Sequence, residues 1–224
     1  MTRLAIAIAS IIALSACAHA QEAPKGDLQV RFLAERTPEE IGQVLLAAEK
    51  YKGVPFDLPI NYLSPPQAPP GKSFSVWSVA KNVSLATVTL PEKGKSFIVL
   101  LIPSAKAGYD PVVIASDDPS FKPGDVYFYN HADRTVLGYV GTSKFTIAPD
   151  KGQMLRPAGL KEGKYYDVGF GVREKEGDRV LSTSRWPEDN KMRSYMFFFI
   201  NPRTQRLDFR AVDEFVPPGS PQKP

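Results

Sequence analysis

Apolar and polar residues alternate over short segments through most of the chain. The clearest alternating segments are residues 28–34, 74–79, 83–90, 125–130 and 165–173. Each has the length of a strand and is followed by turn-forming residues such as Gly, Pro, Asn or Asp. Alternation with a period of two places one side chain in the core and the next in solvent. The pattern therefore predicts a mainly β protein.

Two segments, residues 96–103 and 194–200, are apolar at nearly every position. A strand with apolar side chains on both sides is usually central and covered on both faces. Short strands with frequent turns are typical of sandwiches and barrels. We therefore expect a single antiparallel β-sandwich, Ig-like or jelly-roll-like, over residues 27–215. A boundary at residues 104–110 would give two smaller domains, but residues 96–103 need cover from both halves of the chain.

The segment 38–49 fits two different structures. Thr37 and Glu40 have the spacing of a capping box around a proline, and the apolar residues that follow fall on one helical face. These signals predict a short helix. The same segment, with the residues after it, also has the pattern of two strands that turn at Lys52 and Gly53. We favour the helix and keep the hairpin as the alternative.

The N-terminus has the pattern of a signal peptide. Residues 4–14 are apolar except for Ser10 and follow a single basic residue, Arg3. A membrane-spanning helix needs about 20 apolar residues, so this run is too short to be one and suits the apolar region of a signal peptide. The protein is therefore predicted to be exported.

Two cleavage sites are consistent with this leader. The A-x-A pattern that ends at Ala20 predicts a signal peptide of residues 1–20 and a secreted protein. The preceding LSAC, residues 14–17, resembles the lipobox of bacterial lipoproteins. That resemblance implies a signal peptide of residues 1–16 and a diacylglycerol joined to the sulfur of Cys17. We favour lipidation because the only cysteine of the chain stands directly after LSA.

A lipid on Cys17 would place the protein in the cell envelope. The acyl chains would hold it to a membrane by burying CH₂ groups, and residues 17–26 would form a short polar tether. Ala18 is not the acidic retention signal of inner-membrane lipoproteins, so the resemblance implies the outer membrane or the periplasm. Either cleavage leaves no free thiol for a disulfide, a nucleophile or a metal ligand. The Pro-rich end, residues 216–224, is predicted to be disordered.

Composition and charge narrow the range of partners. Of the 224 residues, 43% are hydrophobic and 23% are charged, which is typical of a globular chain with one sizeable core. The net charge of +4 is spread along the chain, whereas nucleic-acid-binding proteins concentrate basic residues on one face. We therefore expect no nucleic-acid partner, which leaves other envelope proteins or glycans.

The chain lacks the residues of common catalytic centres. His131 is the only histidine outside the predicted leader and tether, and one imidazole does not make the multi-histidine site of copper or catalytic zinc. No G-x-S-x-G elbow accompanies it. The G-K-S triplets at 71–73 and 94–96 lack the earlier glycine of a phosphate-binding loop. We predict no catalytic residue, no metal and no cofactor.

Asp117, Asp118 and Asp125 form a suggestive acidic stretch. Carboxylates are the hard oxygen ligands that calcium prefers, although this spacing is not that of an EF-hand. Asp-Pro at 118–119 and Pro-Gly at 123–124 are also strong turn formers. We favour turns and keep a calcium site as the alternative.

The polar segment 182–195 contains the best candidate for recognition of a ligand. Trp186 lies there between Arg185 and Arg193. An exposed indole beside guanidinium and amide groups is suited to stack on a sugar ring and to hydrogen-bond its hydroxyls. In the competing interpretation, Trp186 closes one end of the sandwich and Arg185 pairs with a nearby acid.

Together these observations favour a non-catalytic exported envelope protein that binds or scaffolds other components. The alternative is a glycan-binding module centred on Trp186. A further alternative is a hydrolase that uses loop carboxylates, for which Asp117, Asp118, Glu188 and Asp189 are the candidates.

Overall fold

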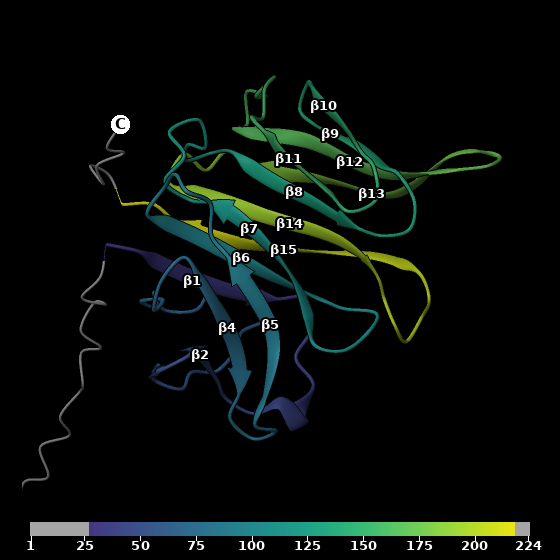
Figure 1. Ribbon diagram of the computed structural model, residues 1–224. Coiled ribbons are helices and arrows are strands. Elements are labelled where there is room, and N and C mark those ends of the chain that lie inside the picture. The colour runs from purple at the N-terminus through teal and green to yellow at the C-terminus, as the bar shows by residue number, and fades with distance from the viewer. Residues whose placement is uncertain (1–26, 218–224) are drawn as a thin grey trace, which may run out of the picture.

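The computed structural model describes residues 27–217, which form fifteen strands and one short 3₁₀ helix (Figure 1). The strands belong to four sheets. We number these sheets I to IV in the order in which they stack. Sheet I has the order β3 (Tyr51–Lys52), β2 (Val44–Ala48), β4 (Ser73–Ser78), β5 (Val83–Thr89), and sheet II the order β1 (Gln29–Ala34), β6 (Ser96–Pro103), β7 (Tyr109–Ala115).

The other two sheets come entirely from the second half of the chain. Sheet III has the order β11 (Lys151–Leu155), β8 (Val126–His131), β14 (Met192–Ile200), β15 (Leu207–Phe215). Sheet IV has the order β10 (Ser143–Ile147), β9 (Val136–Val140), β12 (Tyr165–Glu174), β13 (Gly177–Pro187).

Three hydrophobic cores separate the four layers. Phe32, Val76 and Val99 belong to the core between sheets I and II. Leu100 of β6 and Phe197 of β14 belong to the core between sheets II and III. The core between sheets III and IV is rich in aromatic rings, among them Phe128, Phe145, Phe170 and Phe198. Successive residues of β6 and of β14 therefore face different cores, as the period of two requires.

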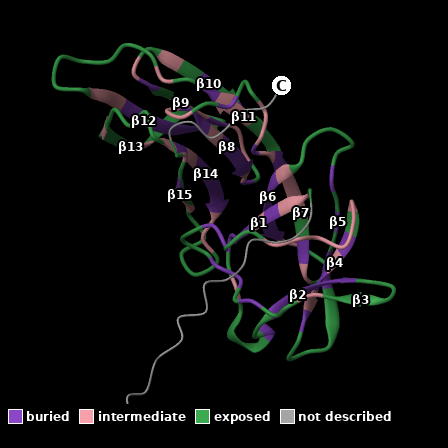
Figure 2. Ribbon diagram, turned by 90° about the vertical axis from the view of Figure 1, so that its left-hand side faces the viewer, coloured by how far each residue is buried: buried purple, intermediate pink, exposed green. Residues whose placement is uncertain are grey.

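The all-β class is confirmed, but a single antiparallel sandwich is not. The protein has four stacked sheets, and β1 pairs with β6 and β8 with β14 in parallel. The physical reason lies in β6 and β14, whose residues are buried along almost their whole length (Figure 2). A two-layer sandwich leaves one face of each sheet in solvent, so it cannot cover both faces of either strand.

The helix predicted at 38–49 is wrong, and the alternative of two strands is correct. Only Glu39–Ile41 forms a 3₁₀ turn, which ends at Gly42 with φ of 59°. The chain then enters β2, turns at residues 49–50 and returns as β3, three residues earlier than the predicted turn. Val44 pairs there with Ser78 of β4. Sheet pairing of the apolar run therefore outweighs the local capping signals.

The predicted signal peptide, Cys17, the tether and the Pro-rich end from residue 218 lie outside the described residues. Within residues 27–217, no helix is long and apolar enough to cross a membrane.

Candidate ligand-binding groove

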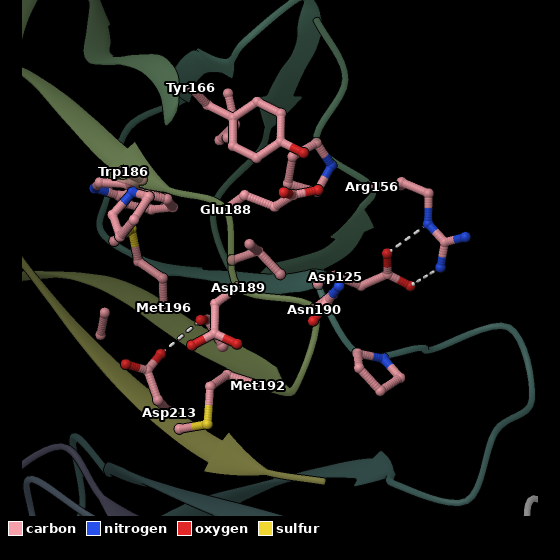
Figure 3. Close-up of a pocket in the computed structure, with 18 of the residues that line it drawn as sticks. Asp125, Arg156, Tyr166, Trp186, Glu188, Asp189, Asn190, Met192, Met196 and Asp213 are labelled. Carbon is pink, nitrogen blue, oxygen red and sulfur yellow. Dashed lines mark hydrogen bonds and ion pairs between the residues drawn. The ribbon is translucent and has the colours of Figure 1, made fainter. Parts of the chain in front are cut away.

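A groove of about 550 Å³ opens between sheets III and IV (Figure 3). On one side of these two sheets the outer strands β10 and β11 contact each other. On the opposite side the outer strands are β13 and β15, and residues of both line the groove. The groove therefore lies where the core between sheets III and IV meets solvent.

Aromatic and sulfur-containing side chains contribute much of the apolar lining of the groove, beside valines, prolines and Ala211. Trp186 and Tyr166 are directly opposite each other on β13 and β12. The indole packs against Phe170 of the core with 5.6 Å between ring centroids. Met196 and Phe209 of sheet III line the same space. Trp186 is held by the core on one side and borders the groove on the other.

Four carboxylates and one guanidinium surround this apolar surface, so the lining carries an excess of negative charge. The guanidinium is already neutralised, because Arg156 binds both oxygens of Asp125 at 2.7 and 2.6 Å. Asp213 accepts a hydrogen bond from the Ser194 hydroxyl at 2.6 Å. Asp189 accepts one from the backbone N–H of Lys191 at 2.9 Å.

Glu188 is the fourth carboxylate of the groove. Its side chain has no hydrogen-bond or ion-pair partner within residues 27–217 (Figure 3). Burial and the charge of Glu188 raise the pKa of Tyr166 above its ordinary value. The Tyr166 phenol is therefore protonated at neutral pH and available as a donor, beside a carboxylate available as an acceptor.

The three residues predicted to act together at this site do not lie together. Trp186 lines the groove, but Arg185 is the preceding residue of the same strand and points to the opposite face. Its guanidinium lies 4.9 Å from the ring centroid of Tyr165 and 3.6 Å from a carboxylate oxygen of Asp167. The predicted pairing of Arg185 with an acid is therefore present, outside the groove.

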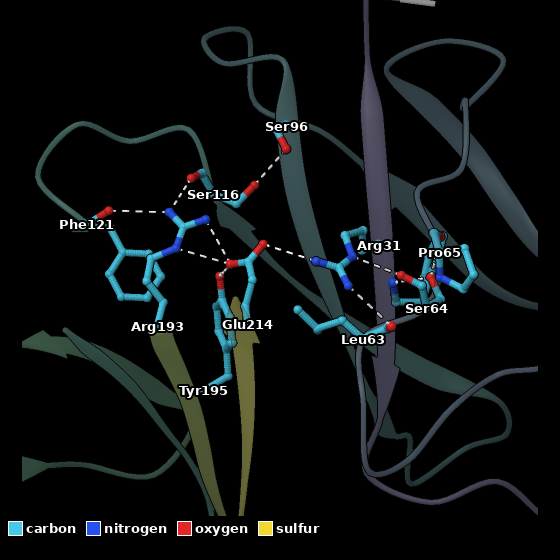
Figure 4. Close-up of polar contacts among 11 residues, drawn as sticks. Arg31, Leu63, Ser64, Pro65, Ser96, Ser116, Phe121, Arg193, Tyr195 and Glu214 are labelled. Carbon is cyan, nitrogen blue, oxygen red and sulfur yellow. Dashed lines mark hydrogen bonds and ion pairs between the residues drawn. The ribbon is translucent and has the colours of Figure 1, made fainter. Parts of the chain in front are cut away.

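Arg193 lies in a buried polar network between sheets II and III (Figure 4). It contacts the Glu214 carboxylate at 2.8 and 3.1 Å and donates to the backbone carbonyl of Ser116. Arg31 of β1 and the Tyr195 hydroxyl also bind Glu214, at 3.2 and 2.7 Å. Arg193 therefore joins two sheets and does not face the groove.

The three aspartates of the candidate calcium site also have separate partners. Asp117 accepts from the backbone N–H of Lys95 at 2.6 Å. Asp118 accepts from the N–H and the hydroxyl of Ser120, and these bonds hold the pKa of its carboxyl below the ordinary value. Asp125 binds Arg156 at the groove. No three His, Cys, Asp or Glu side chains in the described part of the chain are grouped as metal ligands.

Sequence reasoning missed the surroundings of His131. Its Nδ1 lies 2.6 Å from a carboxylate oxygen of Glu35, a buried residue at the end of β1. The two residues are far apart in the sequence and meet only because sheets II and III stack. His131, the last residue of β8, is therefore a partner of a buried acid.

Comparison with models of known protein families and with curated proteins finds no match to this chain. Functional inference therefore depends on the chemistry of the groove itself.

Proposed function

We propose that this protein is a non-catalytic, exported cell-envelope protein that binds other envelope components in the groove at Trp186. The observation that supports this most is the combination of an aromatic surface with carboxylates at its edge. Ligand sites are usually largely apolar with a few polar groups that set orientation. Three of the four carboxylates already hold protein partners, so they are suited to fixed recognition contacts.

The same geometry favours binding over hydrolysis. Of the carboxylates proposed for a hydrolase, Asp117 and Asp118 bond to backbone or hydroxyl groups of turns away from the groove. Only Glu188 and Asp189 line it. If the groove is hydrolytic, Glu188→Gln will abolish turnover of a polysaccharide or ester by the mature protein.

A glycan is one candidate ligand, because Trp186 and Tyr166 offer aromatic surface beside hydrogen-bonding groups of Glu188 and Asn190. The excess of carboxylates favours neutral or cationic glycans over acidic ones. The arginines first expected to bind the sugar are elsewhere, so the polar partners would be carboxylates and an amide.

The proposal is tested with the mature protein on a glycan array and against a displayed peptide library. We expect a ligand whose binding falls about tenfold or more in Trp186→Ala, because a central aromatic contact is lost. Tyr165→Ala and Arg185→Ala change the other face of sheet IV and serve as controls. If every ligand found binds Trp186→Ala as well as the wild type, the groove is not the binding site.

The proposed location is the outer membrane or the periplasm. A lipid on Cys17 would anchor the protein there, and residues 17–26 would form the tether. Cys17→Ala should lose both labelled fatty acid and membrane attachment, since the anchor is the acyl chain. If the wild type takes up no fatty acid and cleavage is found after residue 20, the protein is secreted instead.

A further inference from the structure

Among residues 27–217, no strand pairs with the outer edge of β15 where it borders the groove. β14 and β15 are antiparallel, and the N–H of Val216 bonds to the carbonyl of Lys191 in line with their ladder. In such a ladder alternate residues direct both backbone groups to the partner strand. Even-numbered residues of β15 therefore bond to β14, while Ala211 and Asp213 direct their N–H and C=O groups away from it.

The side chains of these same residues line the groove. Phe209, Ala211 and Asp213 are on its surface, and Phe215, next in the row, is 56% exposed. At Ala211 and Asp213 the strand therefore presents backbone groups that have no partner within residues 27–217, with a row of side chains on the face beside them. An edge of this kind is a template for pairing with another chain.

The facing edge of β13 is protected, and that of β15 is not. In β13 the residues that direct their backbone outward include Pro187, which has no N–H. A register shift between Phe170 and Gly171 of β12 marks a bulge in the same pair of strands, and bulges turn an edge away from pairing. Strand β15 has no proline, and its pairing with β14 has no register shift.

We propose that the groove binds an extended polypeptide segment of a partner protein. This segment pairs with the outer edge of β15 and carries a basic and an apolar residue two positions apart, so that both side chains face the groove. This inference rests on the proposed function and names its ligand class. Backbone pairing would supply affinity, while alternate side chains would enter the groove and supply specificity.

Charge and apolar surface define those side chains. Asp213 on β15 and the loop residues Glu188 and Asp189 offer negative charge to a lysine or arginine. The only guanidinium of the lining is already held by Asp125. Trp186 and Met196 offer apolar contact to the next groove-facing residue. A glycan would use the aromatic surface but would leave the strand edge unpaired.

The experiment selects displayed random heptapeptides on the mature protein and measures affinity for the best synthetic peptide. We expect selected sequences with basic and apolar residues two positions apart. Ala211→Pro removes one outward N–H without removing a bond to β14, and should weaken binding about tenfold. Ala211→Val adds similar bulk to the groove but keeps the N–H, so it should lose clearly less affinity than Ala211→Pro. Thr183→Pro alters the edge of β13 at a residue outside the groove lining, and should bind nearly as the wild type does.

A second arm does not depend on the stability of any variant. The same peptide with N-methyl groups at alternate residues cannot donate to the strand edge, and should bind about tenfold more weakly than its isomer methylated at the intervening residues. Acidic selected peptides, or indifference to both Ala211→Pro and N-methylation, would overturn the inference.

The outcomes separate this inference from the proposed function. Peptide binding that is lost in Trp186→Ala but unaffected by Ala211→Pro or N-methylation keeps the groove and rejects strand pairing. If a glycan binds in a way that depends on Trp186 and no peptide binds, the groove is again kept as the binding site and strand pairing is again rejected. Binding that ignores Trp186 rejects both.

Discussion

The carboxylate of Glu214 is surrounded by two guanidinium groups and a phenol, all within 3.2 Å (Figure 4). Three of the four groups are almost inaccessible to solvent, so their charges and hydrogen bonds depend on one another. Burial and the negative charge of Glu214 raise the pKa of Tyr195 well above its ordinary value, so the phenol stays protonated as a donor. A buried ion pair is costly to break, because removal of one partner leaves the other charge uncompensated.

Glu214→Ala should therefore lower the free energy of unfolding by about 3–5 kcal/mol, because it leaves Arg193 buried without its counter-ion. Urea unfolding measures the change. Asp178→Ala removes an exposed partner of Arg173 and should have a much smaller effect. Equal effects of the two substitutions would show that the Glu214 network contributes no more than a surface ion pair.

Tyr129 should make stability sensitive to alkaline pH. Burial, followed by the charges of Asp150 and other nearby groups, raises its pKa from 10 to about 12. The neutral phenol is favoured in the folded state, so its contribution is complete below pH 10 and is lost as pH rises from 10 to about 12. In Tyr129→Phe, the fall in unfolding free energy over this window should be smaller, as measured by urea unfolding. Tyr62→Phe at an exposed position is the control, and equal pH profiles for all three proteins would contradict the assignment.

At the scale of elements, the alternation of apolar residues located most strands correctly, while pairing between distant residues could not be read from it. The two strands apolar on both faces proved to be covered on both faces. The local capping signals at 38–49 wrongly predicted a helix. Val44 pairs with β4 instead, and this tertiary pairing cannot be read from the local sequence.

The same distinction explains the candidate site. Trp186 was identified from the sequence as an aromatic residue in a polar segment. Because neighbouring residues of a strand point to opposite faces, alternation alone could have shown that Arg185 does not face the same side as Trp186. Arg193 required knowledge of Glu214, which is 21 residues away. Asp213 and Arg156 were missed because nothing local distinguishes them from other charged residues of strand ends; only the stacking of sheets III and IV brings them to one groove.

Gly141, in the turn after β9, lies directly against the segment that carries Arg156. It has φ of 61°, and a Cβ there would overlap the carbonyl oxygen of Ala158. Gly141→Ala should therefore lower the free energy of unfolding by about 1–3 kcal/mol, through backbone strain and displacement of residues 156–158. Thermal unfolding measures it. Gly71→Ala, at a position with open space around it, should be nearly neutral, and similar losses in both variants would remove this explanation.

At the scale of the whole molecule, the middle core decides whether the four sheets unfold together. Sheets II and III are each covered on both faces, and the core between them joins the two outer pairs of layers. The stack also leaves sheets I and IV as the outermost layers (Figure 1). The chain's two tryptophans lie in these outermost sheets, Trp77 in β4 and Trp186 in β13. Each therefore reports on a different end of the stack.

We expect both tryptophans to report one transition. In Trp186→Phe the fluorescence comes from Trp77, and in Trp77→Phe it comes from Trp186. A shared middle core makes the ends cooperative, so each single-tryptophan protein should give the same urea midpoint by fluorescence as by circular dichroism. Adding Phe197→Ala, which removes a buried ring from the middle core, should lower both free energies of unfolding equally, by about 3–5 kcal/mol. If the Trp77 and Trp186 signals separate, or if Phe197→Ala shifts only one of them, sheets I and II and sheets III and IV are two folding units that contact each other, and residues 27–215 are not one domain.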